Sequence, residues 1–89
     1  MISPLPAAVT VRVLLFATYA DMTGQEAVEF TLPEPVTVGD VIRRLRASLP
    51  GAEQIPERPL AAVNRVQADL DAVVSDGDEV ALLPPLAGG

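Results

Sequence analysis

The stretch that does most to decide the fold is DGDEVALLPPLAGG, residues 76–89. Its Asp-Gly-Asp opening is typical of a tight turn, and the apolar run Glu79–Leu83 that follows predicts a buried final strand. Pro84 and Pro85 cannot donate a backbone hydrogen bond to a sheet, and both favour an extended backbone. The chain is therefore expected to leave its last strand as an extended tail over residues 84–89.

The first strand is predicted near the other end of the chain. Apolar residues alternate along Val9–Ala17, which is the period of a β-strand, and Leu14 and Phe16 make its second face apolar too. A strand with two apolar faces is typical of the centre of a sheet, or of a strand whose second face meets a partner. Turn-forming residues in Thr18–Gln25 predict the loop of a β-hairpin that leads into a second strand, Glu26–Leu32.

One amphipathic helix is predicted in the middle of the chain. Thr37 is a candidate N-cap with Asp40 three residues later, the spacing of a capping box, so the helix should begin at Val38. Pro50-Gly51 should end it. Arginines lie on the side expected to face solvent. The apolar residues recur at helical spacing and should pack on the sheet, and they are Val38, Val41, Ile42, Leu45 and Leu49.

The remaining elements are short. Leu60–Asn64 predicts a third strand, Asn64-Arg65 a turn, and Val66–Leu70 a weak strand that pairs back. The order β-β-α-β-β predicts an α+β fold of the β-grasp (ubiquitin-like) type, with a mixed sheet covered on one face by one helix. If the first and last strands are neighbours at the centre they run parallel, although spacing alone does not fix strand neighbours. Residues 1–8 are then a flexible extension, 9–83 the domain and 84–89 the tail.

Composition excludes several classes of function. The chain has 89 residues and a net charge of −6, which argues against a nucleic-acid binder because such proteins cluster Lys and Arg. It contains no Cys and no His, so thiolate and imidazole nucleophiles and the commonest zinc ligands are absent. The longest apolar run, Val13–Ala17, is far short of the roughly 20 residues that cross a bilayer. With no basic residue before Val9 there is no signal peptide pattern, and we expect a cytoplasmic protein without a metal site.

The two final residues carry the chemistry of the tail. Gly88 and Gly89 have no Cβ atom, so the terminal carboxylate of Gly89 is able to enter a channel too narrow for other residues. A terminal diglycine alone is a weak signal, because many chains end in small residues. It becomes specific where it follows an apolar last strand and a double proline.

With these features the chain resembles the small subunits of molybdopterin synthase, a family of ubiquitin-like sulfur carriers, over nearly all of residues 9–89. The matching stretches are VRVLLFA at 11–17, LAAVN at 60–64 and the whole of 76–89. Leu82 and Leu83 stand where aromatic residues are common in the family, and residues 1–8 have no counterpart there.

The resemblance implies a carrier cycle. An ATP-dependent adenylating enzyme would join Gly89 to AMP, and a sulfur donor system would replace AMP to leave a terminal thiocarboxylate. In a heterotetramer with a large catalytic subunit, the sulfur would pass to cyclic pyranopterin monophosphate in molybdenum cofactor biosynthesis. The chain would bind no cofactor and would be no enzyme on its own, in keeping with its lack of His, Cys and Lys. The tail residues that would insert into the large subunit are Pro84, Pro85, Leu86, Ala87 and Gly88.

Partners must also recognise the body of the domain. Leu14 and Phe16 lie on the second face of the first strand, with Leu83 beside them if the central strands pair. The resemblance places Phe16 and Leu83 in an apolar docking patch. The alternative is a second small core beneath residues 1–8, and docking is favoured because one helix covers only one face of the sheet.

Other functions stay open. The same activated tail would serve sulfur carriers for cysteine, thiamine or transfer-RNA thiolation, although Pro84-Pro85 favours molybdopterin. A modifier that joins Gly89 to lysines of target proteins, and an adaptor with an inert tail, are interpretations from other classes. Asp76, Asp78 and Glu79 resemble a carboxylate cluster, but Asp76-Gly77-Asp78 is interpreted as a turn and not as a metal site.

Overall fold

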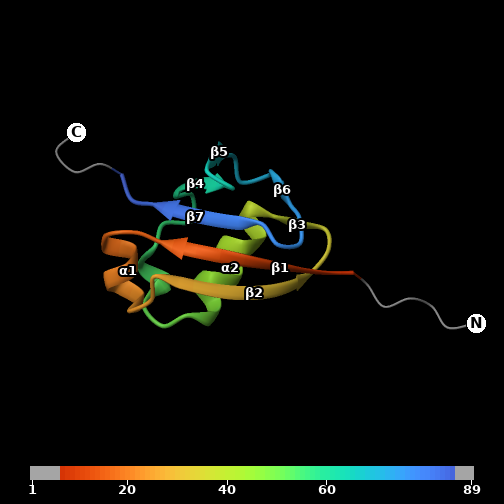
Figure 1. Ribbon diagram of the computed structural model, residues 1–89. Coiled ribbons are helices and arrows are strands. Elements are labelled where there is room, and N and C mark those ends of the chain that lie inside the picture. The colour runs from red at the N-terminus through yellow and green to blue at the C-terminus, as the bar shows by residue number, and fades with distance from the viewer. Residues whose placement is uncertain (1–6, 86–89) are drawn as a thin grey trace, which may run out of the picture.

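A computed structural model describes residues 7–85, and the expectations for residues 1–6 and 86–89 lie outside that range. Figure 1 shows the main sheet with α2 against one face and α1 at one end. The elements in chain order are β1 (Ala8–Leu15), α1 (Thr18–Thr23), β2 (Ala27–Pro33), β3 (Val36–Thr37), α2 (Val38–Ser48), the short 3₁₀ helix η1 (Ala52–Gln54), β4 (Leu60–Val63), β5 (Val66–Ala68), β6 (Val73–Val74) and β7 (Glu79–Leu83).

The main sheet has five strands in the order β2-β1-β7-β4-β5. The predicted parallel pair at the centre is confirmed, since β1 and β7 run in the same direction with Val13 opposite Val80. All other pairs in this sheet are antiparallel. Strands β3 and β6 form a separate two-stranded sheet. The fold is therefore the β-grasp arrangement that the order of elements predicts.

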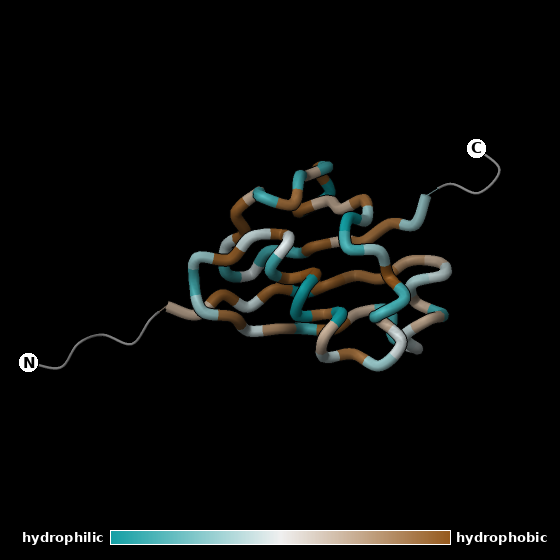
Figure 2. The backbone as a smooth tube through the Cα atoms, turned by 180° about the vertical axis from the view of Figure 1, so that it is seen from behind, coloured by the Kyte–Doolittle hydropathy of each residue, from teal (hydrophilic) through white to brown (hydrophobic). Residues whose placement is uncertain are grey.

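The hydrophobic core lies between the sheet and α2. Every second residue of β1 from Val9 to Leu15 is buried against it, and α2 contributes Val41, Ile42 and Leu45, each at most 1% exposed. Figure 2, seen from the side opposite to Figure 1, shows apolar segments running through the middle of the domain. Because side chains alternate along a strand, this packing uses one face of the sheet and leaves the other open.

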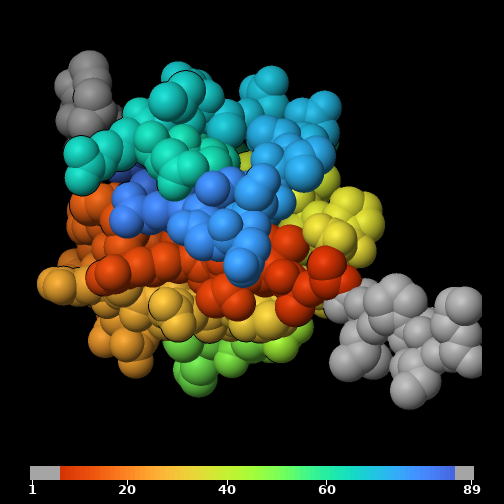
Figure 3. All heavy atoms as spheres, turned by 45° about the vertical axis from the view of Figure 1, so that its right-hand side comes forward, coloured from red at the N-terminus to blue at the C-terminus, as the bar shows by residue number. Residues whose placement is uncertain are grey.

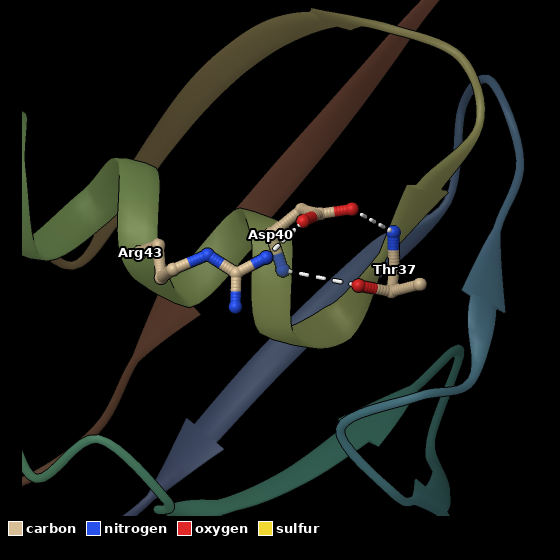
Figure 4. A network of polar contacts seen from close by, with 3 residues as sticks. All are labelled: Thr37, Asp40 and Arg43. Atoms are coloured by element: carbon tan, nitrogen blue, oxygen red, sulfur yellow. Dashed lines mark hydrogen bonds and ion pairs between the residues drawn. The ribbon is translucent and has the colours of Figure 1, made fainter.

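The start of α2 is fixed by the predicted capping box, which is confirmed (Figure 4). The N–H of Thr37 donates to Oδ2 of Asp40 at 2.9 Å, and the N–H of Asp40 donates to the hydroxyl of Thr37 at 3.2 Å. The backbone hydrogen bond from Thr37 is the main reason that the pKa of Asp40 lies below its ordinary value, with the Thr37 hydroxyl and Arg43 helping and partial burial opposing. Arg43 also forms an ion pair with Asp40.

Two more N–H groups at this helix start bond to the loop between β5 and β6. Val38 donates to the carbonyl of Ala72 at 3.0 Å, and Gly39 donates to the carbonyl of Leu70 at 2.8 Å. The four N–H groups that begin a helix have no partners within it. Here all four N–H groups donate to acceptors within the protein, so the start of α2 has no free N–H group to offer a ligand.

The prediction of a loop for Thr18–Gln25 is wrong, because residues Thr18–Thr23 form the helix α1. Tyr19 is 3% exposed and packs into the core, and Gly24 ends the helix in a left-handed conformation. Six residues are too few to show a helical period, and Asp, Thr and Gly also favour turns, so the local pattern indicates a loop. Strands β1 and β2 still pair antiparallel, as the predicted hairpin requires.

Several strand limits also differ from the sequence-based prediction. β1 begins at Ala8, within the extension predicted for residues 1–8, and it ends at Leu15 and not at Ala17. The second strand runs one residue later than predicted, as Ala27–Pro33. By contrast, the last strand has the predicted limits of Glu79–Leu83.

Candidate functional site

An apolar patch lies on the open face of the sheet, opposite α2. Its strand residues are neighbours by register, since Leu14 lies opposite Ala81, Ala81 opposite Ala62, and Leu83 opposite Leu60. In Figure 3 the atoms of β1 (red) and β7 (blue) lie side by side at the surface. We call this the apolar patch, and it consists of Leu14, Phe16, Leu60, Ala62, Ala81 and Leu83.

The exposure of the patch follows from strand alternation. Leu15 and Leu82 point to the core and are at most 3% exposed, whereas Phe16 is 44% and Leu83 38% exposed. Leu60 is 50% exposed. Large apolar side chains that gather on one exposed face are typical of a surface that binds another protein.

The other half of the open face is polar. The hydroxyl groups of Thr10 and Thr31 are 2.9 Å apart and share a hydrogen bond between β1 and β2. Next to them Arg12 lies in register between Glu29 of β2 and Glu79 of β7. The open face is thus divided along β1, with its polar half near the start of the strand and its apolar half near the end.

The tail begins beside the apolar patch. β1 and β7 are parallel, so both end at the same edge of the sheet, which is also where α1 lies (Figure 1). Pro84 is half-buried and Pro85 exposed directly after β7. The predicted inserting residues Leu86, Ala87 and Gly88, and the predicted reactive terminus at Gly89, lie outside the described residues.

The structure places all three predicted docking residues on this one surface. Leu14 is partly exposed in β1, Phe16 directly follows β1, and Leu83 ends β7. Sequence analysis did not find Leu60, Ala62 or Ala81. Their alternation within short strands was a signal, but only the register of β4 against β7 places them beside Leu83.

A shallow hollow of about 410 Å³ adjoins the patch where β1 meets α1 and β2. Leu14, Phe16 and Arg12 line it from β1 and its end, and Ala20 of α1 and Ala27 of β2 complete the wall. The hollow gives the patch a concave margin, which an apolar side chain of a partner could fill.

The acidic residues near β7 accept hydrogen bonds from nearby backbone and side-chain groups. Oδ1 of Asp76 accepts from the N–H of Thr10 at 2.8 Å. Oδ2 of Asp78 accepts from the N–H of Ser75 at 2.7 Å, and its Oδ1 accepts from the side-chain amide of Asn64 at 2.9 Å. These bonds join the turn before β7 to β1 and to the turn after β4, which confirms the interpretation of this segment as a turn.

Two other kinds of site are not seen in residues 7–85. Within that range no group of three or more His, Cys, Asp or Glu side chains is arranged to hold a metal ion. None of the helices described there is long and apolar enough to span a membrane.

Comparison with known proteins identifies the family. The model of the ThiS family matches residues 13–89 of this chain. The chain belongs to the ThiS family. The predicted resemblance to ubiquitin-like sulfur carriers is thereby confirmed.

Two relatives of this chain have informative names. The molybdopterin synthase sulfur carrier subunit of Mycobacterium tuberculosis is 36% identical over 84 residues, covering 91% of this chain and 99% of that protein. Small archaeal modifier protein 3 of Haloferax volcanii is 33% identical over 85 residues, covering 83% of this chain and 92% of that protein. The relatives of this chain therefore include a protein named as a sulfur carrier and a protein named as a modifier.

Solved structures share the fold. The crystal structure of SAMP1 from Haloferax volcanii matches with a TM-score of 0.80 and 28% identity, covering 90% of this chain and 99% of that one. A chain in the complex of subunits 1 and 2 of the Helicobacter pylori molybdopterin-converting factor matches with a TM-score of 0.63 and 24% identity, covering 91% of this chain and 100% of that one. The second likeness shows the fold alone, and that structure is a complex of two subunits.

Proposed function

We propose that this chain is the sulfur carrier and small subunit of a molybdopterin synthase. The observation that carries the proposal is the similarity to a relative named as a molybdopterin synthase sulfur carrier subunit, and the family match, which extends through residue 89, agrees with it. The apolar patch beside the end of β7 supports it, because a partner that binds the patch is also placed to receive the tail.

The proposed chemistry takes place at the carboxyl end of the chain. The carboxylate of Gly89 attacks ATP on an adenylating enzyme, and an acyl adenylate forms as pyrophosphate leaves. A carboxylate oxygen is a poor leaving group, whereas AMP is a good one. Sulfide from a sulfur donor then forms a C–S bond as the C–O bond to AMP breaks, which releases AMP and leaves a thiocarboxylate. ATP is a substrate of the activating enzyme, and this chain binds no cofactor of its own.

The carrier supplies sulfur and position, and the partner supplies catalysis. The sequence contains no His, Cys or Lys to act as a general base or nucleophile. A large subunit would bind the apolar patch, receive residues 84–89 in its active site and transfer the sulfur to cyclic pyranopterin monophosphate. Two such pairs would make up the heterotetramer. Holding the thiocarboxylate against its acceptor is the contribution that this chain would make to the rate.

The experiment that tests the proposal is the intact mass of the protein isolated from its own cells without reductant. The expected result is a species heavier by the difference between one sulfur and one oxygen atom, with the change localised to Gly89 by fragmentation. The matched control is a variant with one residue added after Gly89. Its carboxylate would no longer reach the nucleotide, so it should give neither the mass change nor pyrophosphate exchange. An unmodified wild-type terminus under every charging condition would overturn the proposal.

A second candidate function is that of a protein modifier, which the relative named small archaeal modifier protein 3 favours. A modifier would join Gly89 to lysines of target proteins, and cell extracts would contain larger adducts that resist thiol. A sulfur carrier would remain a free protein that gains one sulfur. Carriers for cysteine, thiamine or transfer-RNA thiolation give the same charged form, so the acceptor must be identified by supplying the thiocarboxylate to each pathway's transfer enzyme.

A further inference from the structure

The chain turns sharply where β1 ends, and Ala17 makes this turn. It has a φ of 50° and a ψ of −124°. These angles are close to the first central position of a type II′ β-turn, which glycine normally occupies because a Cβ atom is crowded there. The N–H of Tyr19 donates to the carbonyl of Phe16 at 3.0 Å and closes the turn. A non-glycine residue in such a conformation is strained, and it persists only where the surrounding structure holds it.

Both ends of α1 are fixed, which explains how the strain is maintained. Near its start Tyr19 is 3% exposed within the core. Near its end Met22 lies against Gly51, which follows α2. A Cβ atom added to Gly51 would stand only 1.9 Å from the carbonyl oxygen of Met22. Because α1 is held at these two places, Ala17 must adopt the angles that connect β1 to it.

The turn keeps Phe16 on the apolar patch. Leu15 on one side and Tyr19 on the other point into the core, whereas Phe16 between them remains 44% exposed. Phe16, Ala17 and Ala20 all line the hollow beside the patch. At an ordinary negative φ, Ala17 would send the chain in another direction.

We propose that Ala17 is a positioning residue for docking, and that its strained turn holds Phe16 ready on the apolar patch. This inference rests on the proposed function, because it gives Phe16 a partner to meet. A turn with a purely structural role would be better served by glycine, which adopts these angles without strain. Alanine lowers the stability of the domain in this conformation, but it has fewer other conformations than glycine that are compatible with the packing of α1. Less ordering of Phe16 therefore remains to be done when the partner binds.

The test is Ala17→Gly in the full chain, with opposite effects expected on stability and on binding. Relief of the strain should raise Tm by about 5 °C. The backbone order parameter at Phe16 in the free protein should fall from about 0.85 to below 0.6. Affinity for the purified large molybdopterin synthase subunit of the same organism should fall roughly fivefold. The matched control is Ala47→Gly on the exposed side of α2, which should lower Tm and leave both other quantities unchanged.

Phe16→Ala and the double variant complete the design. Once the Phe16 ring is removed, Ala17→Gly should cause no further loss of affinity, and an equal loss with and without the ring would overturn the inference. A lower Tm for Ala17→Gly would also overturn it, because the turn would then not be strained. If the wild-type chain does not bind the large subunit at all, the proposed function fails. The order parameter at Phe16 then decides alone, and no change on Ala17→Gly overturns the positioning role.

Discussion

Alanine substitutions at two glycines with the same φ should differ greatly in their effect on stability. Gly51 and Gly77 both have a φ of 89°. An added Cβ atom would meet nothing within 4 Å at Gly77, whereas at Gly51 it would stand 1.9 Å from the carbonyl oxygen of Met22. Ordinary contact begins at 3.4 Å, so the backbone around Gly51 or α1 must move apart before an alanine fits. The pair of variants therefore separates the cost of φ from the cost of the contact.

The expected magnitudes follow from these two terms. A side chain at positive φ costs about 1–2 kcal/mol, and the smaller entropy of the unfolded alanine chain returns about 0.4–1 kcal/mol, so Gly77→Ala should lose about 1 kcal/mol. Gly51→Ala should lose about 2–3 kcal/mol more, because tightly packed backbone atoms must move to make room for the added Cβ atom. Against a total stability on the order of 10 kcal/mol, this loss is large.

Urea unfolding followed by circular dichroism measures the difference. With a slope of about 1 kcal/mol per M for a domain of this size, the midpoint of Gly51→Ala should lie about 2–3 M below that of Gly77→Ala. Equal midpoints would refute the reasoning, because the close approach of α1 to Gly51 would then contribute nothing to stability. The urea midpoint of Gly77→Ala relative to that of the wild type measures the cost of a side chain at positive φ by itself.

Three further outcomes are expected. Phe16→Asp should weaken binding of the large subunit about 30-fold with little unfolding. A Phe side chain has an area of roughly 200 Å², and burying the 44% that is exposed at Phe16 is worth about 2 kcal/mol. A large loss of stability of the free domain in urea would instead make Phe16 part of the core. Asp40→Asn should cost about 1 kcal/mol at neutral pH through the lost capping box. Because the folded pKa of Asp40 is lowered from 3.8, its contribution is present above that value and disappears as pH falls through the folded pKa, so stability curves of the two proteins that stayed parallel into acid would contradict this. Leu82→Ala should cost about 2–5 kcal/mol because Leu82 is 0% exposed, and thermal unfolding should show a much smaller loss for Leu83→Ala on the open face; similar losses would mean that the two faces of β7 are not distinct.

The parts of the fold that could be predicted from the sequence are those with local signals. The capping box needs only Thr37 and Asp40, and the last strand needs only its turn and its apolar run, so both were predicted correctly. The strands β3 and β6 have two residues each, which is too few to show a period.

The candidate site shows the same limit. Leu14 and Phe16 are found from the alternation of one strand, but Leu60 joins them only through the pairing of β4 with β7. The angles of Ala17 are the reverse case, since the local sequence argues against them. The angles of Ala17 are imposed by the packing of α1 through Tyr19 and against Gly51, two residues that are far apart in the sequence.

The parallel pairing of β1 with β7 has a mechanical consequence for the proposed action of the tail. A pull applied beyond Leu83 acts along β7, which is bonded to β1 on one side and β4 on the other. Both ladders of hydrogen bonds are then loaded in shear. Their hydrogen bonds cannot break one at a time, as they do when a hairpin is unzipped. Force exerted on the tail, as when it is withdrawn from a narrow channel, would be resisted by the two central ladders together, so the domain would stay folded while the tail is pulled.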